Sequence, residues 1–147
     1  MTDPVSAERV EVRIERLLPA PAAAVFAAWT TPELMAGWLS ATGQAEVRAD
    51  VRPGGAFTLV MVGDGARIEH TGEYLVVDPP HRLVFTWRSA YTGERPSLVT
   101  VTLEAQGDQT RLVLTHAHLP EEHAESHRDG WGRIVDNLAS LLSAAGA

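Results

Sequence analysis

Hydrophobic residues recur at steps of three, four and seven toward the end of the chain, between Leu119 and Ala147. This spacing places them along one side of an α-helix with 3.6 residues per turn. We therefore predict a long C-terminal helix with one apolar face, long enough to cross a small domain. The repeating positions are Trp131, Ile134, Val135, Leu138, Leu141 and Leu142.

A different pattern, strict alternation of hydrophobic and charged residues, covers positions 9–18 and predicts a half-buried strand. Pro19 ends this strand, and Pro21 suits the first turn of a helix over 21–30. A second short helix is predicted to follow from Thr31. The inward residues of these three elements are Val10, Val12, Ile14, Val25, Phe26, Trp29, Leu34, Met35 and Trp38.

From residue 44 onward, short hydrophobic runs alternate with turn residues rich in glycine, proline and aspartate. This arrangement is typical of an antiparallel sheet with hairpin connections. A sheet of seven strands tends to curl, and the long helix is available to fill its concave side. The predicted fold class is α+β, a curved seven-stranded antiparallel sheet gripping a C-terminal helix. The six further strands are predicted at 44–51, 56–62, 67–77, 82–90, 97–105 and 110–118.

Five segments in this order resemble the START-like, helix-grip superfamily (SRPBCC), and within it the branch of activator of heat shock protein 90 ATPase. The resemblance implies one domain over 8–147, preceded by a flexible N-terminus at 1–7, with an internal hydrophobic cavity. It does not imply one function, because relatives include lipid and polyketide binders, cyclases, hydroxylase domains and co-chaperones. The segments are APAAAVFAAWTTPELMAGWL (20–39), VRPGGAFTLVM (51–61), GEYLVVDPPHRLVFTW (72–87), LVTVTLEAQGDQTRLVLTHAHLP (98–120) and HRDGWGRIVDNLASLL (127–142).

The composition narrows the function classes. The chain of 147 residues is 45% hydrophobic, has a formal charge of -7, and uses arginine for all 12 basic residues. A negative chain without a basic cluster argues against nucleic-acid and membrane-surface binding. No cysteine is present and no apolar run approaches the roughly 18 residues of a membrane span, so we expect a cytoplasmic protein without disulfides.

The alternation also predicts which side chains face the cavity that the family implies. An apolar cavity with a few polar groups suits a small hydrophobic molecule, which is the predicted ligand. The alternative is that these side chains are ordinary core residues with satisfied hydrogen bonds. The candidates are Trp38, Phe57, Met61, His70, Tyr74, Phe85, Trp87, Leu114, His116, His127 and Trp131.

Histidines form two pairs near the start of the long helix. His116 and His118 are two apart on a strand, and His123 and His127 are four apart on a helix, so each pair is expected to share a face. Such pairs can ligate zinc, but HAESH is not the HExxH motif, and we predict no metal and no cofactor. Solvated or hydrogen-bonded histidines are the preferred interpretation.

The sequence leaves open whether the protein is an enzyme. His70 or His116 would suit proton transfer in a cyclase-like reaction, yet no nucleophile motif accompanies them, so no catalytic residue is assigned. A protein-interaction module is the other alternative, with a homodimer or a chaperone as partner. Gly130 and Gly132 flank Trp131 inside the helix. We interpret them first as sites of close packing and second as a soft segment that admits a ligand.

Overall fold

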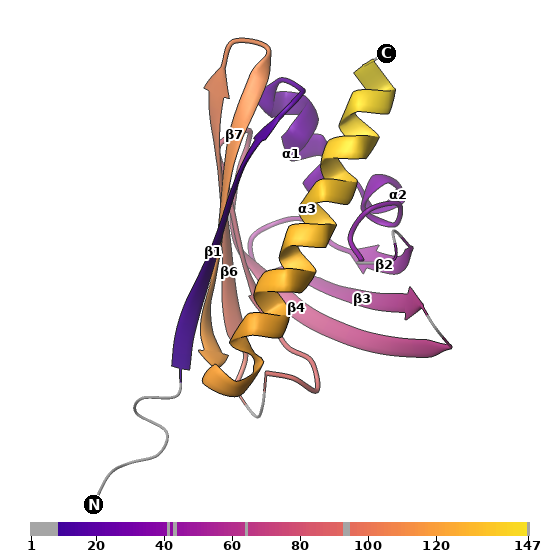
Figure 1. Ribbon diagram of the computed structural model, residues 1–147, viewed down its shortest axis with the longest axis vertical. Helices are drawn as coiled ribbons and strands as arrows, with labels where there is room; N and C mark the ends of the chain where they lie inside the picture. Colours follow the sequence, from indigo (N-terminus) through magenta and orange to yellow (C-terminus); the bar gives the residue numbers. More distant parts are fainter. Residues whose placement is uncertain (1–8, 41, 43, 64, 93–94, 147) are drawn as a thin grey trace, which may run out of the picture.

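The computed structural model of the chain describes residues 9–40, 42, 44–63, 65–92 and 95–146, so the predicted flexible segment 1–7 lies outside the described residues. A curved sheet wraps around one long helix (Figure 1). The elements are β1 (Arg9–Leu18), α1 (Ala22–Thr30), α2 (Pro32–Met35), β2 (Ala45–Ala49), β3 (Ala56–Gly63), β4 (Ala66–Asp78), β5 (Arg82–Trp87), β6 (Ser97–Gln106), β7 (Gln109–Pro120), a 3₁₀ turn (Glu121–His123) and α3 (Ala124–Gly146).

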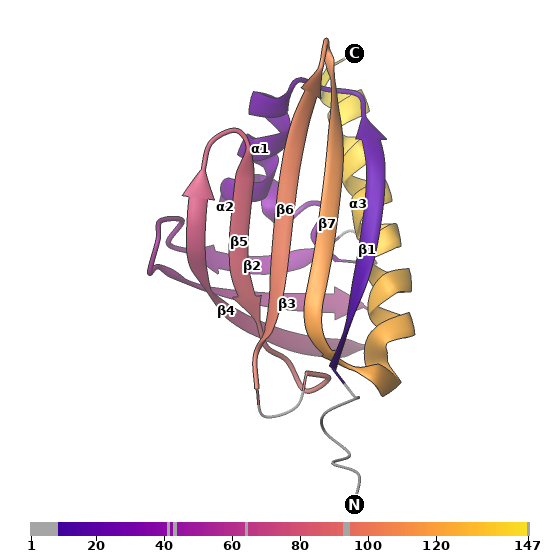
Figure 2. The ribbon, with the colours of Figure 1, turned by 90° about the vertical axis from the view of Figure 1, so that its left-hand side faces the viewer.

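The sheet has the order β1-β7-β6-β5-β4-β3-β2, and each neighbouring pair is antiparallel. Strands β2 to β7 follow one another as a meander, and β1 joins at the far edge beside β7 (Figure 2). The curl turns β2 and β3 across the direction of β6 and β7, so that α3 lies on the concave side of the sheet (Figures 1 and 2). The predicted helix-grip architecture is confirmed.

The sheet bends at β4, which is long enough to serve two neighbours in succession. Its first part, 66–73, pairs with β3, and its second part, from Tyr74 to Asp78, pairs with β5, with a register shift between Tyr74 and Val76. Gly72 lies at this transition. A Cβ atom there would clash with the carbonyl oxygen of Thr86 and the ring of Phe57, so only glycine fits.

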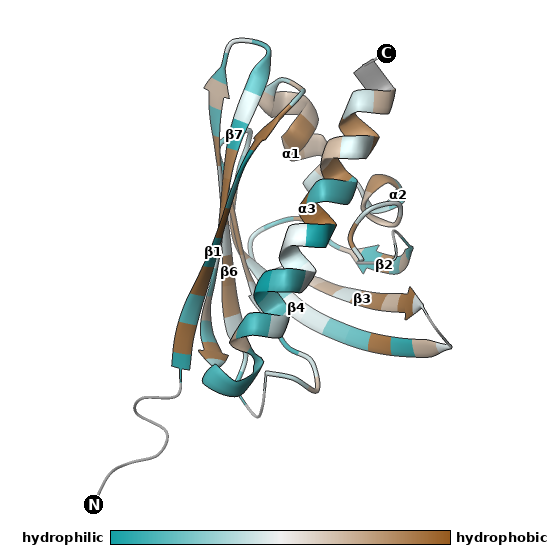
Figure 3. Ribbon diagram, in the orientation of Figure 1, coloured by the Kyte–Doolittle hydropathy of each residue, from teal (hydrophilic) through white to brown (hydrophobic). Residues whose placement is uncertain are grey.

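The second half of α3 packs into a filled core. Ile134, Val135, Leu138 and Leu142 are buried, as their spacing predicts. Helices α1 and α2 close this end with Trp29 and Trp38, whose rings meet edge to face at 4.7 Å. The first turns of α3 are hydrophilic by comparison (Figure 3). The second half of α3 therefore belongs to the core, whereas its first turns are more hydrophilic.

Several predicted boundaries differ from the structure, and two of these differences lie next to the pocket. Strand β7 runs to Pro120 because Arg9 continues to pair with it beyond the end of the β6 ladder, and α3 starts only at Ala124. Strand β5 ends at Trp87 instead of continuing to residue 90, because the chain then enters a turn held by Ser89 and Thr92. Both differences affect the segments beside the pocket described next.

Candidate functional site

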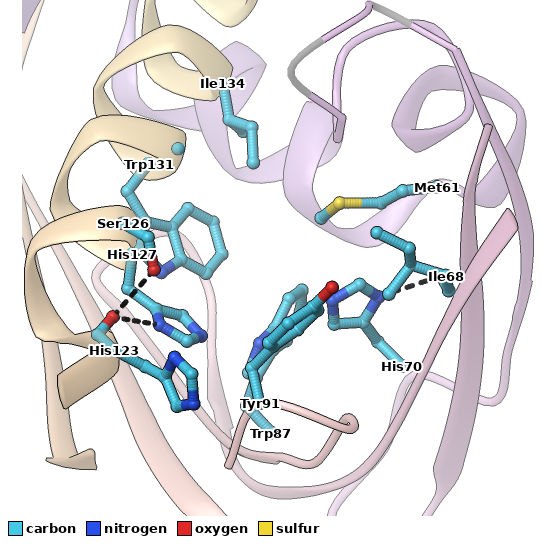
Figure 4. Close-up of a pocket in the computed structure, with 11 residues that line it drawn as sticks. Met61, Ile68, His70, Trp87, Tyr91, His123, Ser126, His127, Trp131 and Ile134 are labelled. Atoms are coloured by element: carbon cyan, nitrogen blue, oxygen red, sulfur yellow. Dashed lines mark hydrogen bonds between the residues drawn. The ribbon is translucent and has the colours of Figure 1, made fainter. Parts of the chain in front are cut away.

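A pocket of about 480 Å³ lies between the first turns of α3 and the inner faces of β3, β4 and β5 (Figure 4). Five of the residues predicted to face a cavity line it, from four different elements. They are Met61, His70, Trp87, His127 and Trp131.

The other six predicted cavity residues do not line the pocket. They point inward, as the alternation indicates, but the inner face of the sheet is larger than the pocket. Aromatic packing fills the remaining space, with ring centroids at 5.4 Å for Phe57 and Tyr74 and at 5.5 Å for Phe57 and Phe85. The residues that belong to the solid core are Trp38, Phe57, Tyr74, Phe85, Leu114 and His116.

Six lining residues were not among the predicted cavity residues. Four of them carry a signal in their spacing. Ile68 is two residues from His70 on β4, and the three others lie three or four residues from His127 or Trp131. Tyr91 lies in the turn after β5, where no periodicity applies, and it is 44% exposed at the edge of the pocket. The six are Ile68, Tyr91, His123, Ser126, Gly130 and Ile134.

Trp87 is the central aromatic residue of the site. Its ring centroid lies 4.6 Å from that of His70 and 5.1 Å from that of Trp131. The ring of Tyr91 lies in front of it in the view of Figure 4 and contacts His123 at 5.5 Å. Together these rings provide flat apolar surfaces suited to an aromatic or polycyclic molecule.

His116 lies behind the pocket in a chain of directed hydrogen bonds. The Trp131 indole N–H donates to Nδ1 of His116 over 2.8 Å, so the imidazole proton is on Nε2. Nε2 then donates to Ser97 Oγ over 2.6 Å, and the Ser97 hydroxyl donates to the Trp87 carbonyl oxygen over 2.7 Å. Burial lowers the pKa of His116 to about 2, which keeps it neutral. Both of its nitrogens are therefore occupied within the core.

The predicted pairing of His116 with His118 on one face is wrong. His118 has a φ of 62°, a left-handed conformation that interrupts the alternation of the strand. Its side chain is exposed, whereas that of His116 is fully buried. The pair His123 and His127 does share a side and lines the pocket.

His70 and His127 each contact a backbone carbonyl through Nδ1, and His70 has a second backbone hydrogen-bond partner, Leu59. Nδ1 of His70 lies 3.1 Å from the Ile68 carbonyl oxygen, and Nδ1 of His127 lies 2.7 Å from the His123 carbonyl oxygen. Burial lowers the pKa of His70 to about 4, and burial also lowers the pKa of His127. Both imidazoles are neutral near pH 7 and stand on opposite sides of the pocket (Figure 4).

The lining is free of formal charge. None of the lining residues is an arginine, aspartate or glutamate. Over the described part of the chain, no group of three histidine or acidic side chains could hold a metal ion. The indole nitrogens of Trp87 and Trp29 are the buried side-chain polar atoms of the described residues that have no hydrogen-bond partner.

The glycines around Trp131 are not sites of close packing. A Cβ atom at Gly130 would meet nothing within 4 Å, and one at Gly132 would meet only the end of the Arg16 side chain at 3.6 Å. Gly130 lines the pocket, so its missing side chain contributes to the open space. The prediction of a close helix–strand contact is wrong at both positions.

Solved structures with the same fold include proteins of several bacteria. A protein from Nitrosomonas europaea is 24% identical with a TM-score of 0.80, and the match covers 99% of each chain. CalU16 from Micromonospora echinospora is 29% identical with a TM-score of 0.73, covering 97% of this chain and 82% of that one. DynU16, from the dynemicin biosynthetic locus, is 26% identical with a TM-score of 0.74, covering 90% of this chain and 47% of that one.

Curated protein sequences gave no significant match. No described helix is both long enough and apolar enough to cross a membrane. The family model for "Activator of Hsp90 ATPase homolog 1-like protein" matches residues 19–143, which include every strand but β1 and nearly all of α3. The chain therefore belongs to this family, the branch of the helix-grip superfamily that its five sequence segments resemble.

Proposed function

We propose that the protein binds a small, mostly apolar molecule in the pocket under the first turns of α3. The observation that carries this proposal is the pocket itself, about 480 Å³ and faced by Met61, Trp87, Trp131 and Ile134. Small-molecule sites usually measure about 300–1,000 Å³ and combine an apolar lining with a few polar groups. The imidazoles of His70 and His127 would supply those polar groups.

The neighbours support a small-molecule role. DynU16 comes from a biosynthetic locus, and its likeness to this chain covers nearly the whole helix-grip domain. The likeness does not identify a ligand or a reaction, since one fold serves many functions. It does favour a low-molecular-weight ligand over a nucleic acid, in agreement with the negative charge of the chain.

Binding accounts for the histidines better than catalysis does. His116 has both nitrogens hydrogen-bonded in the core and no surface on the pocket. His70 lines the pocket, but a pKa of about 4 makes it a weak base at neutral pH, because an efficient general base has a pKa near the working pH. In a cyclase-like reaction His70 would thus position the substrate instead of taking a proton from it.

A paired substitution tests the binding site. Ser126 is exposed at the pocket, and Ser140 is exposed on the same helix outside it. Ser126→Phe would fill the pocket from its open side, so a fluorescent apolar probe such as pyrene should lose binding, whereas Ser140→Phe should retain it. Native mass spectrometry of the purified protein would show whether a ligand copurifies with it. Equal probe binding by the two variants would rule out this pocket as the site.

The family name favours one alternative, an interaction with the Hsp90 chaperone. Such a module would bind the chaperone and raise its ATPase rate. Adding the purified chain to Hsp90 and measuring ATP turnover tests this directly, and the Ser126→Phe variant separates the two functions. Stimulation that survives this substitution would assign the interaction to another surface.

A further inference from the structure

We propose that the pocket selects neutral molecules that carry a hydroxyl group and rejects organic anions of the same size. This inference rests on the proposed function, because it concerns the ligand of that same pocket. It is drawn from the hydrogen-bonding state of two side chains in the lining, His127 and Trp87.

The first observation is the orientation of the His127 imidazole. A backbone carbonyl oxygen only accepts hydrogen bonds, so Nδ1 of His127, next to the His123 carbonyl, must carry the proton. In a neutral imidazole the other nitrogen, Nε2, is then an acceptor. Figure 4 shows the His127 ring with the edge opposite this hydrogen bond turned toward the pocket. His127 therefore offers the pocket an acceptor, which calls for a donor on the ligand.

The second observation is the unused donor on Trp87. Its indole N–H is buried, the side chain is 2% exposed, and no acceptor in the described protein reaches it. Its nitrogen-bearing edge lies on the side that faces His127 (Figure 4). A buried N–H without a partner is costly, so an oxygen that entered beside it would gain a hydrogen bond. Trp87 thus adds a buried, unpaired donor to the acceptor of His127.

A hydroxyl group answers both requirements, since its oxygen accepts and its hydrogen donates. An ether or ketone oxygen would satisfy the indole but leave His127 unpaired. A carboxylate would present only acceptors to Nε2 of His127. The combination of aromatic walls with this polar set fits a neutral phenol or alcohol on an apolar ring system.

The electrostatics exclude anions independently. No arginine lines the pocket, and Arg128, which is on the same helix, is exposed with its Nε 3.6 Å from Glu125. The imidazoles are neutral because burial lowers the pKa of both. A carboxylate or sulfonate would therefore enter a site without a compensating cation, and burial of an unpaired charge is strongly unfavourable.

Three pyrene derivatives of nearly equal size test the selectivity on the full-length protein. 1-Hydroxypyrene is neutral and both donates and accepts, 1-methoxypyrene only accepts, and pyrene-1-carboxylate is an anion. Energy transfer from the tryptophans to pyrene would report each dissociation constant at pH 7.5. We expect 1-hydroxypyrene to bind roughly three- to tenfold more tightly than 1-methoxypyrene, and at least about tenfold more tightly than the carboxylate.

Substitutions test whether the preference for a hydroxyl group depends on His127 and Trp87. His127→Phe removes an acceptor and keeps a ring, so the preference for 1-hydroxypyrene over 1-methoxypyrene should shrink toward unity. Trp87→Phe removes the donor, and Trp29→Phe is its matched control, because Trp29 also has a buried unpaired N–H but does not line the pocket. Circular dichroism verifies that each variant is folded. The preference should survive in Trp29→Phe and weaken in Trp87→Phe.

The outcomes separate the two proposals. Binding of all three probes with similar constants, abolished by Ser126→Phe, would uphold the pocket and overturn its selectivity. Tighter binding of the carboxylate would overturn the selectivity as well. Failure of every pyrene, and of the corresponding smaller naphthalenes, to bind would overturn the pocket as a binding site and the inference with it.

Discussion

Trp131 of α3 donates its indole N–H to Nδ1 of His116 of β7 across 2.8 Å, with both side chains buried. This bond connects the helix to the sheet directly behind the pocket. Because Nε2 of His116 is hydrogen-bonded to Ser97 in turn, the helix is held against two neighbouring strands, β6 and β7. The position of the pocket wall is thus set by a buried polar chain as well as by apolar packing.

Replacing Trp131 with phenylalanine should destabilise the protein by about 2–4 kcal/mol. The substitution removes apolar volume and also leaves the buried Nδ1 of His116 without a donor. Urea denaturation followed by circular dichroism measures the change in the free energy of unfolding. A loss below about 1 kcal/mol would show that the hydrogen bond contributes little.

Trp29→Phe is the matched control for that measurement. Trp29 is as deeply buried as Trp131, but its indole N–H has no partner, so the same substitution removes volume without breaking a hydrogen bond. We expect it to cost about 1–2 kcal/mol less than Trp131→Phe. Equal costs for the two variants would contradict a special role of the bond to His116.

Gly130→Ala and Gly132→Ala should have similar effects on stability but different effects on ligand binding. Each should raise the free energy of unfolding by up to about 1 kcal/mol, because alanine favours the helix and neither new methyl group meets a clash. The methyl group at position 130 points into the pocket and should weaken probe binding, whereas that at position 132 faces β1. Fluorescence titration of the two variants compares them, and equal affinities would contradict this placement.

Acid should destabilise the protein in the range where histidines of the unfolded chain become protonated. His70, with a pKa of about 4, and His116, with a pKa of about 2, remain neutral in the folded state below the unfolded value of 6.5. The unfolded state then binds more protons, so stability is full above pH 6.5 and falls as the pH decreases toward 4. The slope is about 1.4 kcal/mol per pH unit for each such histidine.

Removal of one buried histidine should reduce that slope. His70 contacts the Ile68 carbonyl and the ring of Trp87, and no carboxylate lies in the pocket lining to stabilise its charged form. We expect His70→Phe to lose the contribution of one histidine between pH 6 and 4.5, whereas Trp29→Phe should keep the full slope. Urea midpoints across this pH range give both slopes. An unchanged slope in His70→Phe would show that His70 becomes protonated within the fold.

Gly72→Ala should destabilise the protein by about 3 kcal/mol, since a Cβ atom would overlap the Thr86 carbonyl and the Phe57 ring at the bend of β4. Gly65 provides the comparison. Its φ of 76° strains an alanine, but nothing lies within 4 Å of a Cβ atom there, so Gly65→Ala should cost only about 1 kcal/mol. Thermal unfolding of the two variants distinguishes steric overlap from backbone strain, and similar losses would contradict the distinction.

The periodicity of the chain was sufficient to predict the strands and the long helix. Alternation identifies the inward faces of the strands, and the 3.6-residue period identifies α3, because both depend on local backbone geometry. The family resemblance then supplied the curl of the sheet around the helix. The structure and the family match confirm all of these.

The pocket was predicted only in part, because periodicity tells which way a side chain points and not what it meets. His70 and His116 look alike in the sequence, each alternating with apolar residues, yet one lines the pocket and the other lies behind Trp131. Tyr91 could not be predicted from the spacing of residues, because it lies in a turn and a turn has no repeating pattern. The side of the strand on which His118 lies was predicted incorrectly. His118 itself has a left-handed backbone conformation, which the spacing of residues does not reveal.

Strand β1 has one neighbour in the sheet, β7, and Arg9 pairs with Pro120. During synthesis, β1 therefore leaves the ribosome long before its partner exists and has to wait unpaired while the meander of β2 to β6 forms. Closing so long a loop is entropically costly, so assembly should be slow compared with that of a helical bundle of equal length. Because α3 follows β7 in the chain, the pocket can form only after all seven strands have been synthesised.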